Sequence, residues 1–180
     1  MLNPQFTFET FIVSDSNNFA WAAARAVADS PGKSYNPLFI YGERGSGKTH
    51  LLHAIGHAIS SHNPKARITC VSAASISTEL IESVRTVQLS EFRNKYRQTD
   101  VLLIDDVQHL AGKVRLQEEF FHTFNTLHEK HIQIVLTCNR SPGDIAGLEV
   151  RLAGRFDWGM VADLPAHDKA LIQAISKRQL

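Results

Sequence analysis

Short apolar runs alternate along the chain with longer segments in which apolar residues recur at helical spacing. The apolar runs have the length that is typical of buried strands. They lie at residues 37–41, 67–73, 100–107, 132–138 and 158–164. The run at 100–107 is hydrophobic at nearly every position, which is typical of a strand that is buried on both faces.

Helical periodicity fills the segments between these runs. It extends over residues 48–60, 76–84, 89–96 and 116–127. Strands that alternate with helices predict an α/β fold with a parallel sheet and helices on both faces. Because such sheets bind ligands at the carboxyl ends of their strands, the polar residues that follow each strand are the candidate functional residues.

The length and composition are those of one ordinary globular domain. The chain has 180 residues, which allows a single layered core, and its net charge of +1 means that contact with nucleic acid needs a local basic patch. No apolar run approaches the roughly 20 residues that span a bilayer, and no signal peptide is recognisable, so membrane contact is not indicated. Cys70 and Cys138 lie in strand-like runs, which is typical of buried thiols in a reduced, cytoplasmic protein.

The first predicted strand is followed by GERGSGKT, residues 42–49, and then by a predicted helix. This is the P-loop pattern in its required context. Its glycines allow backbone N–H groups to point at phosphate oxygens, and the positive end of the helix adds to that field. We expect Lys48 to reach the β- and γ-phosphates and the Thr49 hydroxyl to hold Mg²⁺. The predicted nucleotide-binding residues here are Gly42, Gly45, Ser46, Gly47, Lys48, Thr49 and His50.

Two aspartates, Asp105 and Asp106, lie at the end of the third predicted strand, in the sequence LLIDDVQ. Adjacent carboxylates at the end of an apolar run are unfavourable without a cation, so a nucleotide site explains them better than strand capping does. In a P-loop protein Asp105 would complete the magnesium shell, and Asp106 would orient the attacking water or accept its proton. Asn139, which follows the fourth strand, is either a contact to the γ-phosphate or an ordinary turn residue.

The guanine-specifying motif Asn-Lys-x-Asp is missing, because the nearest string, NKYR at 94–97, lacks the aspartate. Several long segments instead carry a recognisable pattern. They are the lead-in LNPQFTFETFIVSDSNNFAWAAARAVA and the segments NPLFIYGERGSGKTHLLHAIGHAI, DVLLIDDVQHLAGKVRLQEEFFHTFNTLHE, IVLTCNRSP and LEVRLAGRFDWGMVADL. Together they resemble the AAA+ domain of the DnaA family of bacterial chromosome-replication initiators.

The resemblance implies a P-loop NTPase fold of AAA+ type with a five-stranded sheet in the order 5-1-4-3-2. It implies that ATP is bound with Mg²⁺ and hydrolysed slowly, which switches off an assembly formed on origin DNA. The lead-in around residues 11–18, with Val13 and Asn18 singled out, would lie against the adenine. Asn139 stands at the sensor position, where the family more often has aspartate. The side chain of Arg44, which is unusual in this loop, is expected to point outward because the cradle works through backbone N–H groups.

Two arginines near the end of the chain match a further family motif. Arg155 matches the arginine that reaches the γ-phosphate of ATP bound by the neighbouring subunit, and Arg151 matches its companion. An arginine supplied in trans stabilises phosphate charge with two parallel hydrogen bonds. The acidic residue that usually precedes the companion is Val150 here.

The resemblance also implies partners. Single-stranded DNA would contact Ile81, Lys113 and Arg115, although Lys and Arg at the entry to a helix are often merely solvated. The other implied partners are double-stranded DNA, further copies of the chain in a head-to-tail oligomer, and a replicative helicase or its loader.

The expected organisation is a lead-in at 1–36, an AAA+ core at 37–165 and the start of a helix at 166–180 that leads to a lid subdomain. Two alternatives remain open: a helicase-loader ATPase of related fold, and a regulatory partner that binds nucleotide without catalysing. The first predicts ATP-driven self-assembly, and the second predicts hetero-assembly with nucleotide binding that is weak or prefers ADP. His50, His53 and His57 share a helix face, but no cysteine or carboxylate completes a metal site, so only Mg²⁺ is expected.

Overall fold

The computed structural model describes residues 2–166 and reproduces the predicted alternation of strands and helices. The strands are β1 (Leu38–Tyr41), β2 (Ile68–Ser72), β3 (Val101–Asp105), β4 (Gln133–Cys138) and β5 (Met160–Asp163). The helices are α1 (Asn18–Asp29), α2 (Lys48–His62), α3 (Ala73–Arg85), α4 (Leu89–Arg97), α5 (Val114–Glu129) and α6 (Val150–Phe156), with 3₁₀ turns at η1 (Val107–Leu110) and η2 (Pro142–Asp144). The helix expected at the end of the chain lies outside the described residues.

The strands form one parallel sheet in the order β2-β3-β4-β1-β5. This is the predicted order 5-1-4-3-2, so the predicted fold class is confirmed. The register places Tyr41 beside Cys138 and Ser72 beside Asp105. The carboxyl ends of β1, β3 and β4 therefore meet at one edge of the sheet, which we call the carboxyl edge.

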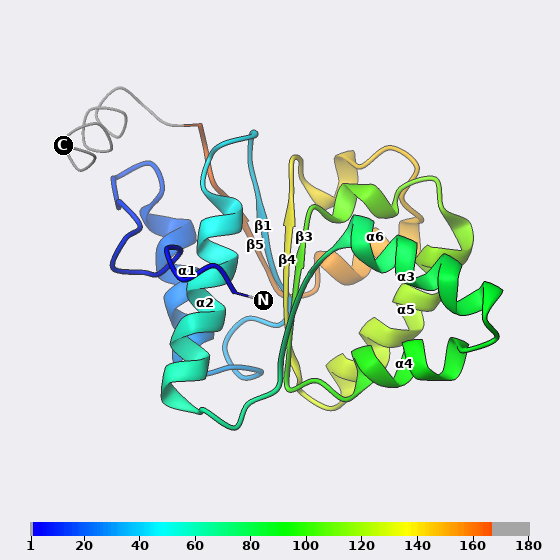
Figure 1. Ribbon diagram of the computed structural model, residues 1–180. Coiled ribbons are helices and arrows are strands. Elements are labelled where there is room, and N and C mark those ends of the chain that lie inside the picture. The colour runs from blue at the N-terminus through cyan, green and yellow to red at the C-terminus, as the bar shows by residue number, and fades with distance from the viewer. Residues whose placement is uncertain (1, 167–180) are drawn as a thin grey trace.

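Helices cover both faces of the sheet (Figure 1). α1 and α2 lie on one face, where their buried side chains pack with Leu38 and Leu103 of the sheet. α3, α4, α5 and α6 lie on the other face, around Phe124 and Phe156. β3 is buried along almost its whole length, as its apolar sequence predicted, and β4 is buried throughout. In residues 2–166, no helix combines the length and hydrophobicity needed to cross a bilayer.

The lead-in contains a helix, α1, that the hydrophobic pattern did not indicate. Its buried face consists of Ala20, Ala23, Ala24, Val27 and Ala28. Alanine contributes little to a hydrophobic pattern, although it has the highest intrinsic helix propensity. Its small side chain also allows α1 to pack closely against α2. High helix propensity in the sequence AWAAARAVA was therefore the signal that could have found this helix.

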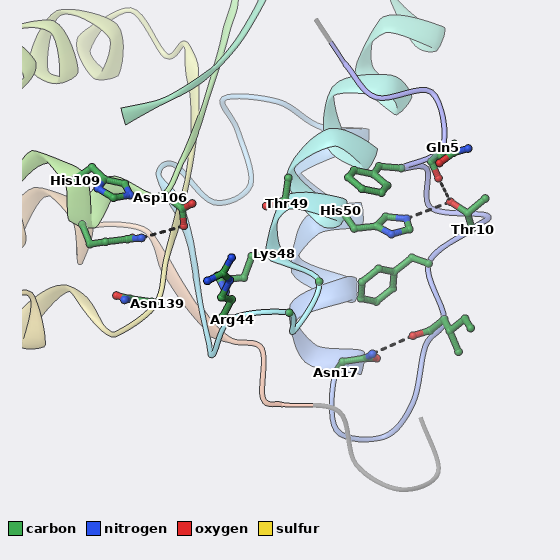
Figure 2. Close-up of a pocket in the computed structure, with 16 residues that line it drawn as sticks. Gln5, Thr10, Asn17, Arg44, Lys48, Thr49, His50, Asp106, His109 and Asn139 are labelled. Atoms are coloured by element: carbon green, nitrogen blue, oxygen red, sulfur yellow. Dashed lines mark hydrogen bonds between the residues drawn. The ribbon is translucent and has the colours of Figure 1, made fainter. Parts of the chain in front are cut away.

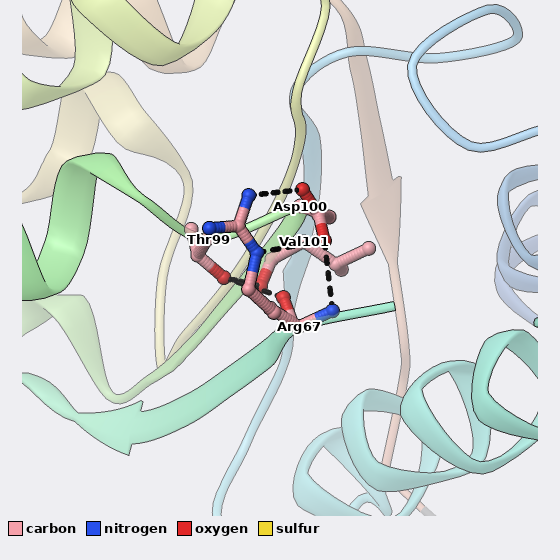
Figure 3. A network of polar contacts seen from close by, with 4 residues as sticks. All are labelled: Arg67, Thr99, Asp100 and Val101. Carbon is pink, nitrogen blue, oxygen red and sulfur yellow. Dashed lines mark hydrogen bonds and ion pairs between the residues drawn. The ribbon is translucent and has the colours of Figure 1, made fainter. Parts of the chain in front are cut away.

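At the amino ends of β2 and β3, a polar network joins the two strands (Figure 3). The Arg67 guanidinium donates from Nη2 to Asp100 Oδ1 at 2.8 Å and from Nε to Asp100 Oδ2 at 3.1 Å. The Thr99 hydroxyl donates to the Arg67 carbonyl oxygen at 2.7 Å. The hydrogen bonds from Arg67 hold the pKa of the Asp100 carboxyl below its ordinary value. Because the pair is exposed, its main effect is to fix where the two strands begin.

Two histidines of α2 bind the backbone of the N-terminal segment, residues 2–10. His53 accepts a hydrogen bond at Nδ1 from the Asn3 backbone N–H at 2.8 Å. His57 donates from Nε2 to the Asn3 carbonyl oxygen at 2.7 Å. The two rings therefore satisfy both backbone groups of the same residue and hold the segment on the helix.

His50, one turn earlier on α2, makes a third attachment. Its Nε2 donates to the Thr7 carbonyl oxygen at 2.8 Å, and the Phe6 ring stacks on its ring with the centroids 4.9 Å apart. The three histidines thus attach the N-terminal segment to one face of α2. Among residues 2–166, no group of three His, Cys, Asp or Glu side chains is arranged to hold a metal ion.

Attachment of the N-terminal segment is expected to weaken in acid. Burial lowers the pKa of His53 below its ordinary value of 6.5, so the folded chain favours the neutral ring that accepts from Asn3. Stability from a lowered folded-state pKa is present above the unfolded value and is lost as the pH falls through the folded value. The urea midpoint should therefore fall between about pH 7.5 and about pH 5. The fall should be smaller in H53N, because the amide Oδ1 accepts without titrating.

H62N is the matched control, since His62 is an exposed residue at the end of the same helix. It should keep the wild-type dependence of the urea midpoint on pH. An equal dependence in H53N and the wild type would contradict the assigned role of His53.

Candidate nucleotide-binding site

A cavity of about 1160 Å³ lies at the carboxyl edge of the sheet. Figure 2 shows that the lead-in and α2 form one side of it, and that the segments following β3 and β4 form the other. Of the predicted residues, the cavity is lined by Gly45, Gly47, Lys48, Thr49, His50, Asp106 and Asn139. The parallel register thus brings together residues from three separate segments of the sequence.

The P-loop turns on two glycines with positive φ. The φ angle is +83° at Gly45 and +103° at Gly47, a region that residues with a side chain rarely adopt. Gly47 is also the N-cap of α2, so the positive end of that helix faces the loop. A Cβ at Gly47 would lie 3.0 Å from the Phe11 ring, which forms part of the cavity wall. This backbone has the concave form that binds phosphate.

The Lys48 ammonium is buried inside the loop. Its Nζ donates to the carbonyl oxygens of Gly42 at 2.8 Å and Glu43 at 2.6 Å. Burial lowers the pKa of Lys48, while the carboxylates of Asp106 and Asp105 act in the opposite direction. A buried ammonium bonded to neutral oxygens is stabilised by a further anion, and phosphate is an anion that this loop can bind.

Asp105 is held between two hydroxyl groups. The Thr49 hydroxyl donates to Asp105 Oδ2 at 2.8 Å, and the Thr137 hydroxyl donates to Oδ1. A hydroxyl and a carboxylate are both oxygen ligands that Mg²⁺ takes. Thr137 also accepts from the Asp106 backbone N–H at 3.0 Å, so it orients both aspartates. The sequence analysis did not single out Thr137. A hydroxyl inside the otherwise apolar run 132–138 was the signal that could have found it.

Asp106 adopts a left-handed backbone conformation, with φ of +58°. Its Oδ1 accepts a hydrogen bond from Gln108 Nε2 at 3.0 Å. Gln108 Oε1 and Ser46 Oγ are buried and make no hydrogen bond with the part of the chain that the structure describes. Because buried polar atoms are normally hydrogen-bonded and Gln108 lines the cavity, its unpaired Oε1 fits a site that takes a polar ligand. The residues present therefore fit a nucleotide with Mg²⁺.

Asn139 and Arg44 both border the cavity. Asn139 follows β4 beside the end of β3 because the two strands pair, as the sequence predicted. Arg44 is one of the residues that line the cavity (Figure 2), so the expectation that its side chain points outward was wrong. That expectation considered only the backbone cradle, whereas a long exposed side chain can still reach the cavity.

The lead-in lines the cavity with residues of the expected range 11–18, but not with the two that were singled out. Val13 and Asn18 are exposed and do not line the cavity, whereas their neighbours Ile12 and Asn17 do. The Asn17 side chain accepts from the Ser14 backbone N–H at 2.8 Å and donates to the Ile12 carbonyl oxygen at 3.0 Å. This closed turn positions Ile12 and Asn17 at the cavity. The structure thus gives no support to adenine contacts from Val13 or Asn18.

Gly42 and Asp105 accept hydrogen bonds from Lys48 and Thr49, and Ser46 is buried, but none of these three predicted residues lines the cavity itself. The other five predicted residues lie elsewhere on the described surface. None of them lines the cavity: Ile81, Lys113, Arg115, Arg151 and Arg155. Their assigned functions therefore require a second molecule, either DNA or a neighbouring copy.

Comparison with known proteins agrees with this geometry. The family model for the bacterial DnaA ATPase domain matches residues 2–163. The chain is 54% identical over 176 residues to the chromosomal replication initiator protein DnaA of Deinococcus deserti. That match covers 98% of this chain but 39% of the relative, so the chain spans less than half of the relative's length.

Solved structures show the same likeness. Domain III of the Thermotoga maritima replication initiation protein DnaA has a TM-score of 0.97 and 44% identity, over 100% of this chain and 75% of that one. A replication initiator DnaA bound to AMPPCP and single-stranded DNA has a TM-score of 0.93 and 39% identity, over 99% of this chain and 55% of that one. The match of the family model over nearly the whole chain shows that this protein belongs to the family of bacterial DnaA ATPase domains.

Proposed function

We propose that this chain is the ATP-binding core of a replication initiator. It binds ATP with Mg²⁺ in the cavity at the carboxyl edge and assembles head to tail with further copies while ATP is bound. Slow hydrolysis reverses the assembly. The family match and the relative bound to AMPPCP and single-stranded DNA support this proposal. A cytoplasmic location follows from this proposal, since the bacterial chromosome lies in the cytoplasm.

The observation that carries the proposal is the hydrogen bond between Thr49 and Asp105. It joins the P-loop to the acidic segment after β3 and so brings a hydroxyl and a carboxylate together as ligands for Mg²⁺. When bound, Mg²⁺ would neutralise charge on the phosphates. Lys48 holds the β- and γ-phosphates, while Asp106 and Asn139 orient the attacking water.

Arg155 acts on the ATP of a neighbouring copy, since it does not line the cavity of its own chain. A guanidinium that binds the γ-phosphate makes assembly depend on ATP rather than ADP. Arg151 is its companion. Its Nε lies 2.7 Å from Glu149 Oε2, so an acidic partner is present although residue 150 is valine.

DNA contacts belong to the face of the sheet that carries α3 and α5. Ile81 on α3 is 61% exposed, and Lys113 and Arg115 are exposed at the start of α5. An apolar side chain with two cations suits single-stranded DNA, whose phosphates and bases are contacted without regard to sequence. Double-stranded DNA and a replicative helicase or its loader are further proposed partners of the whole protein.

Thr49→Val tests the magnesium ligand, because it removes the hydroxyl and keeps the shape of the side chain. With Mg²⁺ present, we expect the Kd for ATP in titration calorimetry to rise about tenfold or more. In EDTA the variant and the wild type should bind ATP equally, and T78V, on α3, should match the wild type in both buffers. An equally large loss in EDTA would show that Thr49 acts on something other than the metal.

Arg155→Ala tests the action in trans. We expect the Kd for ATP to stay within about twofold of the wild-type value, since Arg155 does not line its own cavity. ATP-dependent assembly, measured by light scattering, should be lost. R85A, which removes an exposed arginine of α3, is the control and should assemble. Normal assembly of R155A with ATP would contradict the role, and assembly only with another protein would favour a regulatory partner.

Replacing Lys113 and Arg115 together by alanine tests DNA contact. Each phosphate contact contributes about 0.7 to the slope of log K against log salt for single strands, so the slope should fall by about 1.4. The control replaces Lys33 and Lys65, two exposed lysines that precede β1 and β2 at the opposite edge of the sheet. It makes the same change in net charge, and an equal fall in its slope would mean that binding follows net charge alone.

A further inference from the structure

Three side chains that do not line the nucleotide cavity hold the Arg155 side chain. Its guanidinium carbon lies 3.6 Å from the centroid of the Trp158 ring and 5.4 Å from that of Phe121. Its Nε donates to Asn125 Oδ1 at 2.8 Å. Phe121 and Asn125 lie one turn apart on α5, and Trp158 follows α6. Helix α5 and the segment after α6 therefore both contact the Arg155 guanidinium.

These contacts occupy the flat face and the Nε side of the Arg155 guanidinium. Its Nη1 and Nη2 make no hydrogen bond or ion pair with residues 2–166. These two nitrogens form the edge that binds a phosphate with two parallel hydrogen bonds. The arrangement thus fixes the plane of the guanidinium and leaves its phosphate-binding edge available.

Trp158 is 53% exposed, so burial in the core does not account for a tryptophan at this position. Its ring nevertheless packs on His128, which in turn packs on the core. The rings of Trp158 and His128 are 5.1 Å apart, and His128 stacks on the fully buried Phe124 at 5.9 Å. A surface ring that is fixed to the core of α5 provides a rigid platform for a cation.

Phe121 contacts both arginines of the motif. The guanidinium carbon of Arg151 lies 4.6 Å from the centroid of the Phe121 ring, and that of Arg155 lies 5.4 Å from it. Attraction to the same ring keeps the two cations on one surface in spite of their like charge.

We propose that Trp158 and Asn125 are positioning residues for Arg155. Trp158 supports the guanidinium on its ring and Asn125 fixes its Nε, so that Nη1 and Nη2 meet the γ-phosphate of ATP bound by the neighbouring copy. The inference rests on the proposed function of Arg155. An arginine that is oriented before assembly loses less side-chain entropy when the interface forms. Assembly therefore occurs at a lower protein concentration.

The test uses W158A and N125A in the 180-residue chain with ATP and Mg²⁺. We expect the protein concentration for half-maximal assembly, from light scattering, to rise about tenfold in W158A and about threefold or more in N125A. The Kd for ATP and the urea midpoint should match the wild type. W158F, which keeps an aromatic face, should restore most of the assembly.

R155A is measured first, so that failure of the inference differs from failure of the proposed function. If R155A assembles normally, the function in trans is wrong. If R155A fails to assemble while W158A and N125A assemble like the wild type, the positioning role is overturned. It is also overturned if W158F assembles as poorly as W158A, or if the Kd for ATP rises together with the loss of assembly.

Fluorescence gives a readout that a purely structural role would not change. The chain has two tryptophans, so W21F leaves Trp158 alone to report. Engagement of Arg155 by a phosphate should alter the emission of Trp158 when ATP drives assembly, and W21F combined with R155A should show no change. Assembly of W21F with unaltered emission would overturn the proposal.

Discussion

The functional geometry depends on the parallel register of β1, β3 and β4. Because these strands run in one direction and end level with one another, the residues that follow them reach the same edge of the sheet. Thr49, Asp105 and Thr137 then come within hydrogen-bonding distance although they are far apart in the sequence. A shift of one residue in β4 would turn Thr137 to the opposite face and separate it from both aspartates.

Local sequence patterns predicted the features that depend on local geometry. The P-loop spacing predicted the cradle, and the apolar runs predicted every strand within residues 2–166, while the strand order came from resemblance to a family. The orientation of side chains in the lead-in could not be predicted, because the hydrogen bonds of Asn17 decide that Ile12 rather than Val13 lines the cavity. The role of Thr137 was likewise hidden, since it depends on partners on two other segments.

The nucleotide cavity and Arg155 lie on different parts of the same domain. Under the proposed function, each copy would therefore contribute the cavity to one neighbour and Arg155 to the other. Interfaces of this head-to-tail kind do not close into symmetric pairs. They produce rings or open filaments, according to the rotation between neighbours. The contacts of Trp158 and Asn125 with Arg155 would bear on that choice, because a fixed guanidinium would set the direction in which it approaches a neighbour's phosphate.

The central position of β1 in the sheet affects the order of events during synthesis. β1 ends at Tyr41, but it pairs with β4 and β5, and β4 begins at Gln133. At typical translation rates the ribosome needs roughly 5 to 20 s to make the intervening segment. During that time the strand that leads into the P-loop has neither neighbour. A nascent chain therefore acquires its nucleotide pocket only when the domain is nearly complete, so that nucleotide binding follows folding and does not initiate it.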